Sequence, residues 1–143
     1  LIDENSVDMA QLIVWGRCIE RMPYTYEKII AGRKCVIVHA GYIESLNGVE
    51  TDDYFADLSE FYLYARDDAY IYGGIEHGMI IAGHTPTIFE EELPYNEGNV
   101  YRSYDEIQDC IFYNIDCGCA YRKKHSDAKL ACIRIEDEEV FYI

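Results

Sequence analysis

The sequence has few basic residues and no long hydrophobic run, and both shortages limit what the protein can do. Its 143 residues include 12 Lys and Arg against 27 Asp and Glu, a formal net charge of −15. This balance repels phosphate backbones and argues against a nucleic-acid partner. The apolar runs are only a few residues long, whereas a membrane-spanning helix needs about 20. We therefore expect neither nucleic acid nor a membrane as partner.

Two further absences concern the start of the chain. The first residue is Leu1 rather than Met, and no signal-peptide pattern follows it. We expect a piece of a longer protein, located in the cytoplasm. Half of the residues are hydrophobic and 14% are aromatic. That is enough apolar surface for a packed core, and the length alone suits one domain.

Six cysteines are present, and the lack of a targeting segment argues against a disulfide framework. We predict buried core thiols in a reducing compartment where cysteine stands beside aliphatic residues. These residues are Cys18, Cys35, Cys110 and Cys132. Cys117 and Cys119, with His125 nearby, could form part of a zinc site. Structural zinc sites usually show two clear ligand pairs, however, and the second pair is absent here.

Hydrophobic periodicity predicts two helices, at residues 6–20 and 52–65. In the first, Ser6 is the expected N-cap and Asp8 lies in the first turn, where negative charge suits the helix dipole. Pro23 stands beyond its end. Both helices would use an apolar stripe to pack on the rest of the fold.

Short runs of β-branched and aromatic residues predict strands. They lie at residues 24–30, 35–38, 79–82 and 111–115. Residues 128–135 and 140–143 are expected to form the arms of a hairpin around the acidic turn 136–139. Residues 88–109, rich in Glu and Tyr, are expected to form a loop. Helices and strands together predict an α+β fold.

Three of these strands end on a polar residue beside glycine. The segments are His39-Ala40-Gly41, Gly83-His84 and Asp116-Cys117-Gly118. Strand carboxyl ends in an α/β-type sheet converge on one edge, where ligands commonly bind. Two histidines placed this way can aim neutral ring nitrogens at one metal ion. Each histidine could equally satisfy local hydrogen bonds alone, and this pattern leaves both interpretations open.

The order of motifs adds a resemblance to a known family. Residues 38–41 (Val-His-Ala-Gly), 83–86 (Gly-His-Thr-Pro) and 114–118 (Asn-Ile-Asp-Cys-Gly) resemble the carboxyl-terminal half of calcineurin-like metallophosphoesterases. The nearest branch is the bacterial serine/threonine phosphoprotein phosphatases. Tyr64-Ala65-Arg66 stands where that family has Trp-x-Arg. The resemblance extends from about Tyr24 to the end of the chain.

The resemblance implies a fold and a reaction. Residues 1–143 would be the carboxyl-terminal portion of one catalytic domain, an αββα sandwich with a mixed sheet and a terminal β-hairpin. The whole domain would hydrolyse a phosphoprotein or a small phosphate ester. Two divalent ions (Mn, Fe or Zn) would clamp the phosphate and lower the pKa of a bridging water.

The resemblance also implies roles for individual residues. His39 and His84 would be ligands of the second metal ion. Arg66 would hold phosphate oxygens with its bidentate fork. The alternative interpretation is that Arg66 is a surface arginine at the end of a helix. No residue of the chain is assigned as a catalytic acid or base, and Asp116 is expected to shape the loop beneath the site.

Four other residues carry weaker expectations. Tyr42 and Tyr121 could flank the substrate, although tyrosine is common throughout this chain. His77 and His125 lie outside the motifs and are expected to be solvated.

The family's amino-terminal motifs, which supply the other metal ligands, are absent. Residues 1–34 contain no histidine at all. Two imidazoles cannot hold a dinuclear centre, because hard divalent ions also need carboxylates. We therefore expect the isolated chain to be inactive. It would also expose the inner face of its sheet, and so would self-associate or pair with a complementary amino-terminal fragment.

Two alternatives remain. The chain could be a degenerate phosphatase-like module that binds a protein partner without catalysis. It could also be an unrelated acidic α+β domain.

Overall fold

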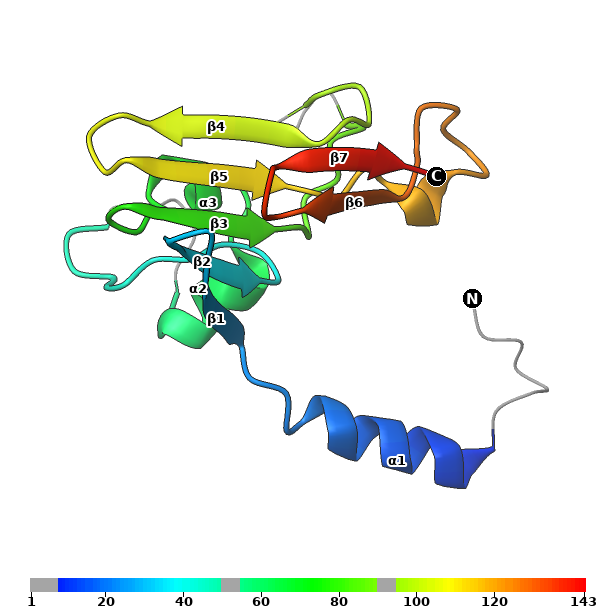
Figure 1. The fold of residues 1–143 in the computed structure, drawn as a ribbon. Helices are drawn as coiled ribbons and strands as arrows, with labels where there is room; N and C mark the ends of the chain where they lie inside the picture. Colours follow the sequence, from blue (N-terminus) through cyan, green and yellow to red (C-terminus); the bar gives the residue numbers. More distant parts are fainter. Residues whose placement is uncertain (1–7, 50–54, 90–94) are drawn as a thin grey trace.

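A computed structural model describes residues 8–49, 55–89 and 95–143 (Figure 1). Within these residues the chain forms a five-stranded mixed sheet and a separate two-stranded hairpin. Two short helices lie on one face of the sheet and the hairpin lies on the other (Figure 1). The predicted α+β class, with a mixed sheet and a carboxyl-terminal hairpin, is confirmed.

The sheet has parallel strands in its middle and antiparallel strands at its edges. The order across it is β1 (Thr25–Ile30), β2 (Arg33–Val38), β3 (Gly78–Ala82), β5 (Cys110–Asn114) and β4 (Tyr101–Asp105). Strands β2, β3 and β5 are parallel. Every residue of β3 and β5 is buried, as expected for parallel strands covered on both faces. The carboxyl ends of these three strands therefore meet at one edge.

Strand β4 contradicts the prediction of a loop over residues 88–109. It pairs with β5 from Tyr101 opposite Asn114 to Asp105 opposite Cys110. Its sequence, Tyr-Arg-Ser-Tyr-Asp, has no aliphatic residue that would reveal a strand. An edge strand has a neighbouring strand on one side only. Its formation therefore depends more on the hydrogen bonds to that neighbour than on an apolar pattern in its own sequence.

The two helices on the sheet are α2 (Leu58–Tyr64) and α3 (Asp68–Ile71). The predicted helix over 52–65 is thus shorter in the described residues, and 52–54 lie outside them. Asp57 is the N-cap of α2, and its carboxylate accepts hydrogen bonds from the backbone N–H groups of Ser59 and Glu60 at 2.8 and 3.1 Å. This cap fixes where the helix begins.

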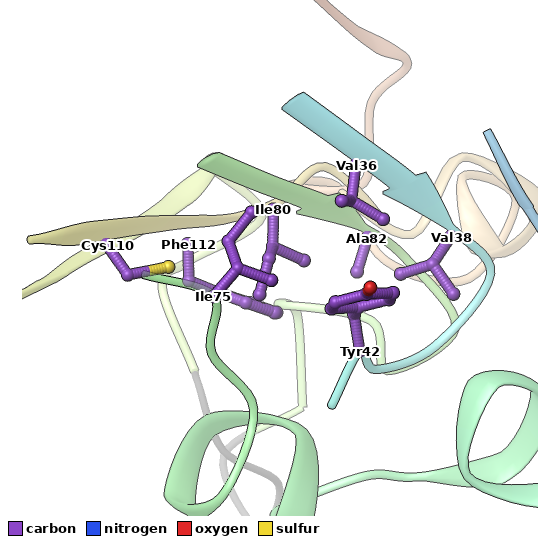
Figure 2. Close-up of a cluster of buried hydrophobic side chains, with 8 residues drawn as sticks. All are labelled: Val36, Val38, Tyr42, Ile75, Ile80, Ala82, Cys110 and Phe112. Atoms are coloured by element: carbon purple, nitrogen blue, oxygen red, sulfur yellow. The ribbon is translucent and has the colours of Figure 1, made fainter. Parts of the chain in front are cut away.

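Two clusters of buried side chains cover the two faces of the sheet. The cluster beneath α2 and α3 is drawn in Figure 2 and consists of Val36, Val38, Tyr42, Ile75, Ile80, Ala82, Cys110 and Phe112. The opposite cluster consists of Cys35, Met79, Ile81, Ile111 and Tyr113. Ile133 and Ile135, in and beside the hairpin, pack against this second cluster.

The hairpin corrects the expectation of a bare inner face. Strand β6 (Ala131–Arg134) falls within the predicted first arm, and β7 (Glu139–Tyr142) begins one residue before the predicted second arm. Met79 and Ile111 beneath it are 3% and 4% exposed. Toward the β1 edge of the sheet, Tyr26 of β1 and Ile37 of β2 are 54% and 40% exposed.

Helix α1 (Met9–Ile19) projects away from the sheet (Figure 1) and buries none of its side chains. Its N-cap is Asp8, whose carboxylate accepts from the backbone N–H of Gln11 at 2.7 Å. The predicted cap, Ser6, lies outside the described residues. Among the residues that the structure describes, no helix has the length and apolar character needed to cross a membrane.

The cysteine prediction is half right. Cys35 and Cys110 are buried, whereas Cys18 and Cys132 are exposed. Cys18 lies on α1, which packs on nothing in the described chain. Cys132 lies on the outward face of β6, where exposed residues alternate with partly buried ones. Aliphatic neighbours therefore did not indicate burial in these two elements.

Candidate functional site

The candidate site lies at the edge of the sheet where β2, β3 and β5 end. His39 follows β2 directly, and His84 follows β3 after one glycine. Hydrogen bonds between backbone atoms continue past the strands. The N–H of Gly83 donates to the carbonyl of His39, and that of Ile115 to the carbonyl of Ala82, both at 2.9 Å. The predicted meeting of these strand ends is confirmed.

The two histidine rings face each other. Nε2 of His39 lies 2.9 Å from Nδ1 of His84, and the ring centroids are 4.7 Å apart. In a neutral pair one nitrogen donates and the other accepts. Two nitrogens bound to one ion at about 2.1 Å, with a ligand angle of about 90–110°, lie about 3.0–3.4 Å apart. The observed spacing is close to that of two ligands of a single ion.

His84 has an unusual backbone conformation, with φ at +71°. This left-handed region is unfavourable for residues with a side chain, and such strain concentrates at functional sites. Two hydrogen bonds hold the turn: the N–H of Thr85 donates to the carbonyl of Gly83 at 2.8 Å, and the Asn114 amide donates to the carbonyl of Thr85 at 2.6 Å. The surrounding contacts thus fix the direction of the His84 ring.

The environment of His84 favours its neutral form. Desolvation lowers the pKa of His84, and the charges of His39 and Arg66 lower it further, while Asp116 raises it. A neutral imidazole keeps the lone pair that a metal ion needs. The same set of interactions shows that Arg66 and Asp116 lie within electrostatic reach of the histidine pair.

Arg66 stands at the end of α2, where Ala65 leaves the helical conformation with ψ at 133°. Its side chain is exposed. Tyr64, which replaces the tryptophan of the resembling motif, is 60% exposed. The structure therefore brings Arg66 to the same edge as the histidines, as the resemblance implies. A guanidinium there can bind an anion held beside the pair.

Gly41 lets α2 and α3 approach the turn that carries His39. A Cβ atom at Gly41 would lie 2.7 Å from Cβ of Ala69 and 3.1 Å from Cβ of Ala65. The backbone N–H of Ala40 donates to the carbonyl of Tyr62 at 2.9 Å, which ties the same turn to α2. Gly41, two residues after His39, is thus required by close packing.

Asn114, the last residue of β5, supports the site in a way that the sequence did not reveal. Its side chain is 0% exposed. Its amide donates to the hydroxyl of Tyr70 at 2.9 Å and to the carbonyl of Thr85, and its oxygen accepts from the N–H of Asp116 at 3.0 Å. The available signal was a polar residue at the end of an apolar strand, because a buried amide must find partners.

Asp116 shapes the loop after β5, as expected. Its carboxylate accepts from the backbone N–H of Gly118 at 3.0 Å, and its carbonyl accepts from the N–H of Thr87 at 2.9 Å. Gly118 has φ at +75°, which the turn requires. The loop is therefore joined both to itself and to the segment after His84.

The weaker expectations for the remaining tyrosines and histidines have different outcomes. The interpretation of Tyr42 was wrong: it is 6% exposed, stacks on Tyr62 and belongs to the core under α2. Tyr121 is 41% exposed and remains at the surface. His77 is exposed as expected, and its Nδ1 lies 3.1 Å from the Asp109 carboxylate.

Within residues 8–49, 55–89 and 95–143, no group of three or more His, Cys, Asp or Glu residues could hold a metal ion. This includes Cys117, Cys119 and His125. Comparison of the sequence with protein-family models and with curated proteins finds no match.

Proposed function

We propose that the chain is part of a metal-dependent phosphoesterase of the serine/threonine phosphatase type. It would hydrolyse phosphate monoesters at a dinuclear metal centre. The observation that carries the proposal is the 2.9 Å approach of His39 Nε2 to His84 Nδ1 at the carboxyl edge of the sheet. Residues 1–143 would be the carboxyl-terminal portion of one αββα catalytic domain.

The donor atoms fit the proposed ions in kind. Imidazole nitrogens suit manganese, iron or zinc, and the lowered pKa of His84, caused first by desolvation, keeps its ring neutral. When bound, the ions supply Lewis-acid charge and an activated water. His39 and His84 would hold one ion, and Arg66 would orient the phosphate oxygens. The remaining ligands would come from a complementary amino-terminal segment.

This division of ligands makes the isolated chain inactive. Two neutral imidazoles neutralise no charge, and they fill only half of a four-coordinate shell. The substrate would be a phosphoprotein or a small phosphate ester.

The test uses the chain together with the coding sequence upstream of Leu1. We expect hydrolysis of p-nitrophenyl phosphate with manganese, and its loss in His39→Ala and His84→Gly. The glycine variant removes the second imidazole without straining the left-handed backbone. His77→Ala, which removes an exposed histidine outside the site, should keep full activity. Full activity in both site variants would refute the proposal.

The second candidate function is a degenerate phosphatase-like module that binds a partner. The same experiment separates the two candidates. An upstream sequence without Asp-x-His and Asn-His-Glu motifs, combined with no turnover, would favour the binding module.

A further inference from the structure

A short basic stretch stands out in this acidic chain. Arg122, Lys123 and Lys124 are the one run of three consecutive cations in the sequence. Residues 121–129 together carry a net charge of +3, counting Asp127, while the whole chain carries −15. All three side chains are exposed.

This stretch begins at the candidate site. The 3-10 helix η1 (Cys119–Tyr121) follows the Asp116 loop and lies beyond the carboxyl end of β5 (Figure 1). The carbonyl of Asp116 accepts from Thr87, three residues after His84, at 2.9 Å. The basic stretch and the histidine pair therefore share one edge of the molecule.

The stretch is held in an ordered turn. The rings of Tyr121 and His125 both pack edge-on against Phe89, with centroids 5.1 and 5.5 Å away. The N–H groups of Lys124 and His125 donate to the carbonyl of Tyr121 at 2.8 and 3.1 Å. A surface built on such a turn presents its charges at little further cost in conformational entropy.

The three cations lack carboxylate partners within the described residues, although acidic residues are abundant. Other basic side chains there do form ion pairs with Asp or Glu. They include Arg33, Lys34, Arg102 and Arg134. Unpaired cations grouped beside a site for an anion indicate a negatively charged partner.

We propose that Tyr121–His125 docks an acidic peptide segment that flanks the phosphorylated residue of a protein substrate. The inference rests on the proposed function, because the histidine pair and Arg66 would receive the phosphate itself. A peptide fits better than an extended polyanion, since the negative charge elsewhere on the chain repels nucleic acid or an anionic membrane. The ring of Tyr121, 41% exposed, offers apolar contact to the same peptide.

Fluorescence anisotropy with the chain as it stands tests this proposal. The probes are a labelled Glu-rich phosphoserine peptide, its unphosphorylated form, and the same peptide with Gln in place of Glu. We expect both Glu peptides to bind, the Gln peptide to bind weakly, and added salt to reduce the difference. The triple variant R122E/K123E/K124E should weaken Glu-peptide binding about tenfold.

The control variant R17E/R21E/K28E makes the same change in charge on α1, on the turn that follows it and on β1. It should leave binding within about twofold of the unmodified chain. An equal loss in both variants, or no loss in the first, would overturn the proposal. Tighter binding of a single-stranded oligonucleotide or of phosphatidylserine vesicles than of the Glu peptide would overturn the choice of partner.

The assay contains no metal and measures no turnover, so its outcome is independent of phosphatase activity. Peptide binding through residues 122–124 without hydrolysis by the longer protein would reject the proposed function alone. Hydrolysis of p-nitrophenyl phosphate with no preference for the Glu peptide would reject the docking surface alone.

Discussion

The Nε2 atom of His39 lies 2.9 Å from the Nδ1 atom of His84, although 45 positions separate the two residues in the sequence. Parallel pairing of β2 with β3 brings the rings together, because both strands end at the same edge. The His84 backbone, the packing at Gly41 and the buried amide of Asn114 then hold the arrangement. Each of these can be tested by substitution.

Replacing His84 should show the strain in its backbone. The φ angle of His84 is +71°, a conformation that glycine adopts more easily than alanine. We therefore expect His84→Gly to be more stable than His84→Ala by about 1 kcal/mol, measured by denaturant unfolding. His39 has no left-handed backbone, so the order should reverse there and His39→Ala should be more stable than His39→Gly. The same order at both positions would contradict the strain at His84.

The two glycines beside the histidines should respond differently to alanine. Gly41→Ala places a methyl group 2.7 Å from Ala69, so we expect a loss of about 1–3 kcal/mol in the free energy of unfolding. At Gly83 the nearest atom would be Cβ of Asp116 at 3.6 Å, an ordinary contact. Gly83→Ala should therefore cost much less. Equal losses in urea unfolding would count against close packing at Gly41.

Asn114→Leu should destabilise the fold, although it keeps the number and branching of the side-chain heavy atoms. The buried carbonyl of Thr85 and the hydroxyl of Tyr70 then lose the amide as a partner. We expect a loss of about 1–3 kcal/mol in the free energy of unfolding. Tyr70→Phe removes one of these bonds and should cost less. Burial raises the pKa of Tyr70 above its usual range, so its hydroxyl stays protonated in the folded protein and takes part in this bond at neutral pH. A double-mutant cycle with unfolding data would measure the coupling.

The N-cap of α2 should give stability that depends on acid pH. The Ser59 hydroxyl, then the Glu60 and Ser59 backbone N–H groups, lower the pKa of Asp57 from 3.8. The ionised carboxylate is thus favoured in the folded state, and its contribution is complete above pH 3.8. It is lost as the pH falls through the lowered folded value. Asp57→Asn keeps an acceptor but no charge, so its melting temperature should fall less than that of the unmodified protein in this range.

The apolar surface of α1 should cause association. Leu12 and Ile19 are 44% and 66% exposed on a helix that packs on nothing within the described chain. An apolar helix of this length is marginal alone in water, so we expect a second copy to cover it in the isolated chain. Sedimentation at micromolar concentration should show dimers or larger species, reduced in L12K/I19K. I107K, at a residue 97% exposed on another turn, should not change the distribution. A monomer in the unmodified chain would contradict this prediction.

The sequence predicted the central strands and their meeting edge because those features have local causes. Val36-Ile37-Val38 and Met79-Ile80-Ile81 are apolar runs bounded by turn residues, which is typical of buried parallel strands. Once they are parallel, the positions of His39 and His84 follow from topology. The pairing of the ring nitrogens needed the structure, because it depends on the left-handed turn at His84.

Other features could not be predicted because they depend on partners distant in sequence. Strand β4 forms because it pairs with β5. The role of Asn114 depends on its hydrogen bonds to Tyr70 and Thr85. Cys18 was predicted to be buried from its aliphatic neighbours. Those neighbours lie on α1, whose apolar side chains find no partner in the described chain.

The separation of 45 positions between His39 and His84 has a consequence for folding. In the unfolded chain the two imidazoles are far apart, so an ion held by both, as proposed, would close a loop and bind the native state alone. Such an ion would raise the free energy of unfolding as its concentration increases, by mass action. Metal affinity would then serve as a reporter of the pairing of β2 with β3. A slow step in forming that non-local pair would appear as a delay before the ion can bind.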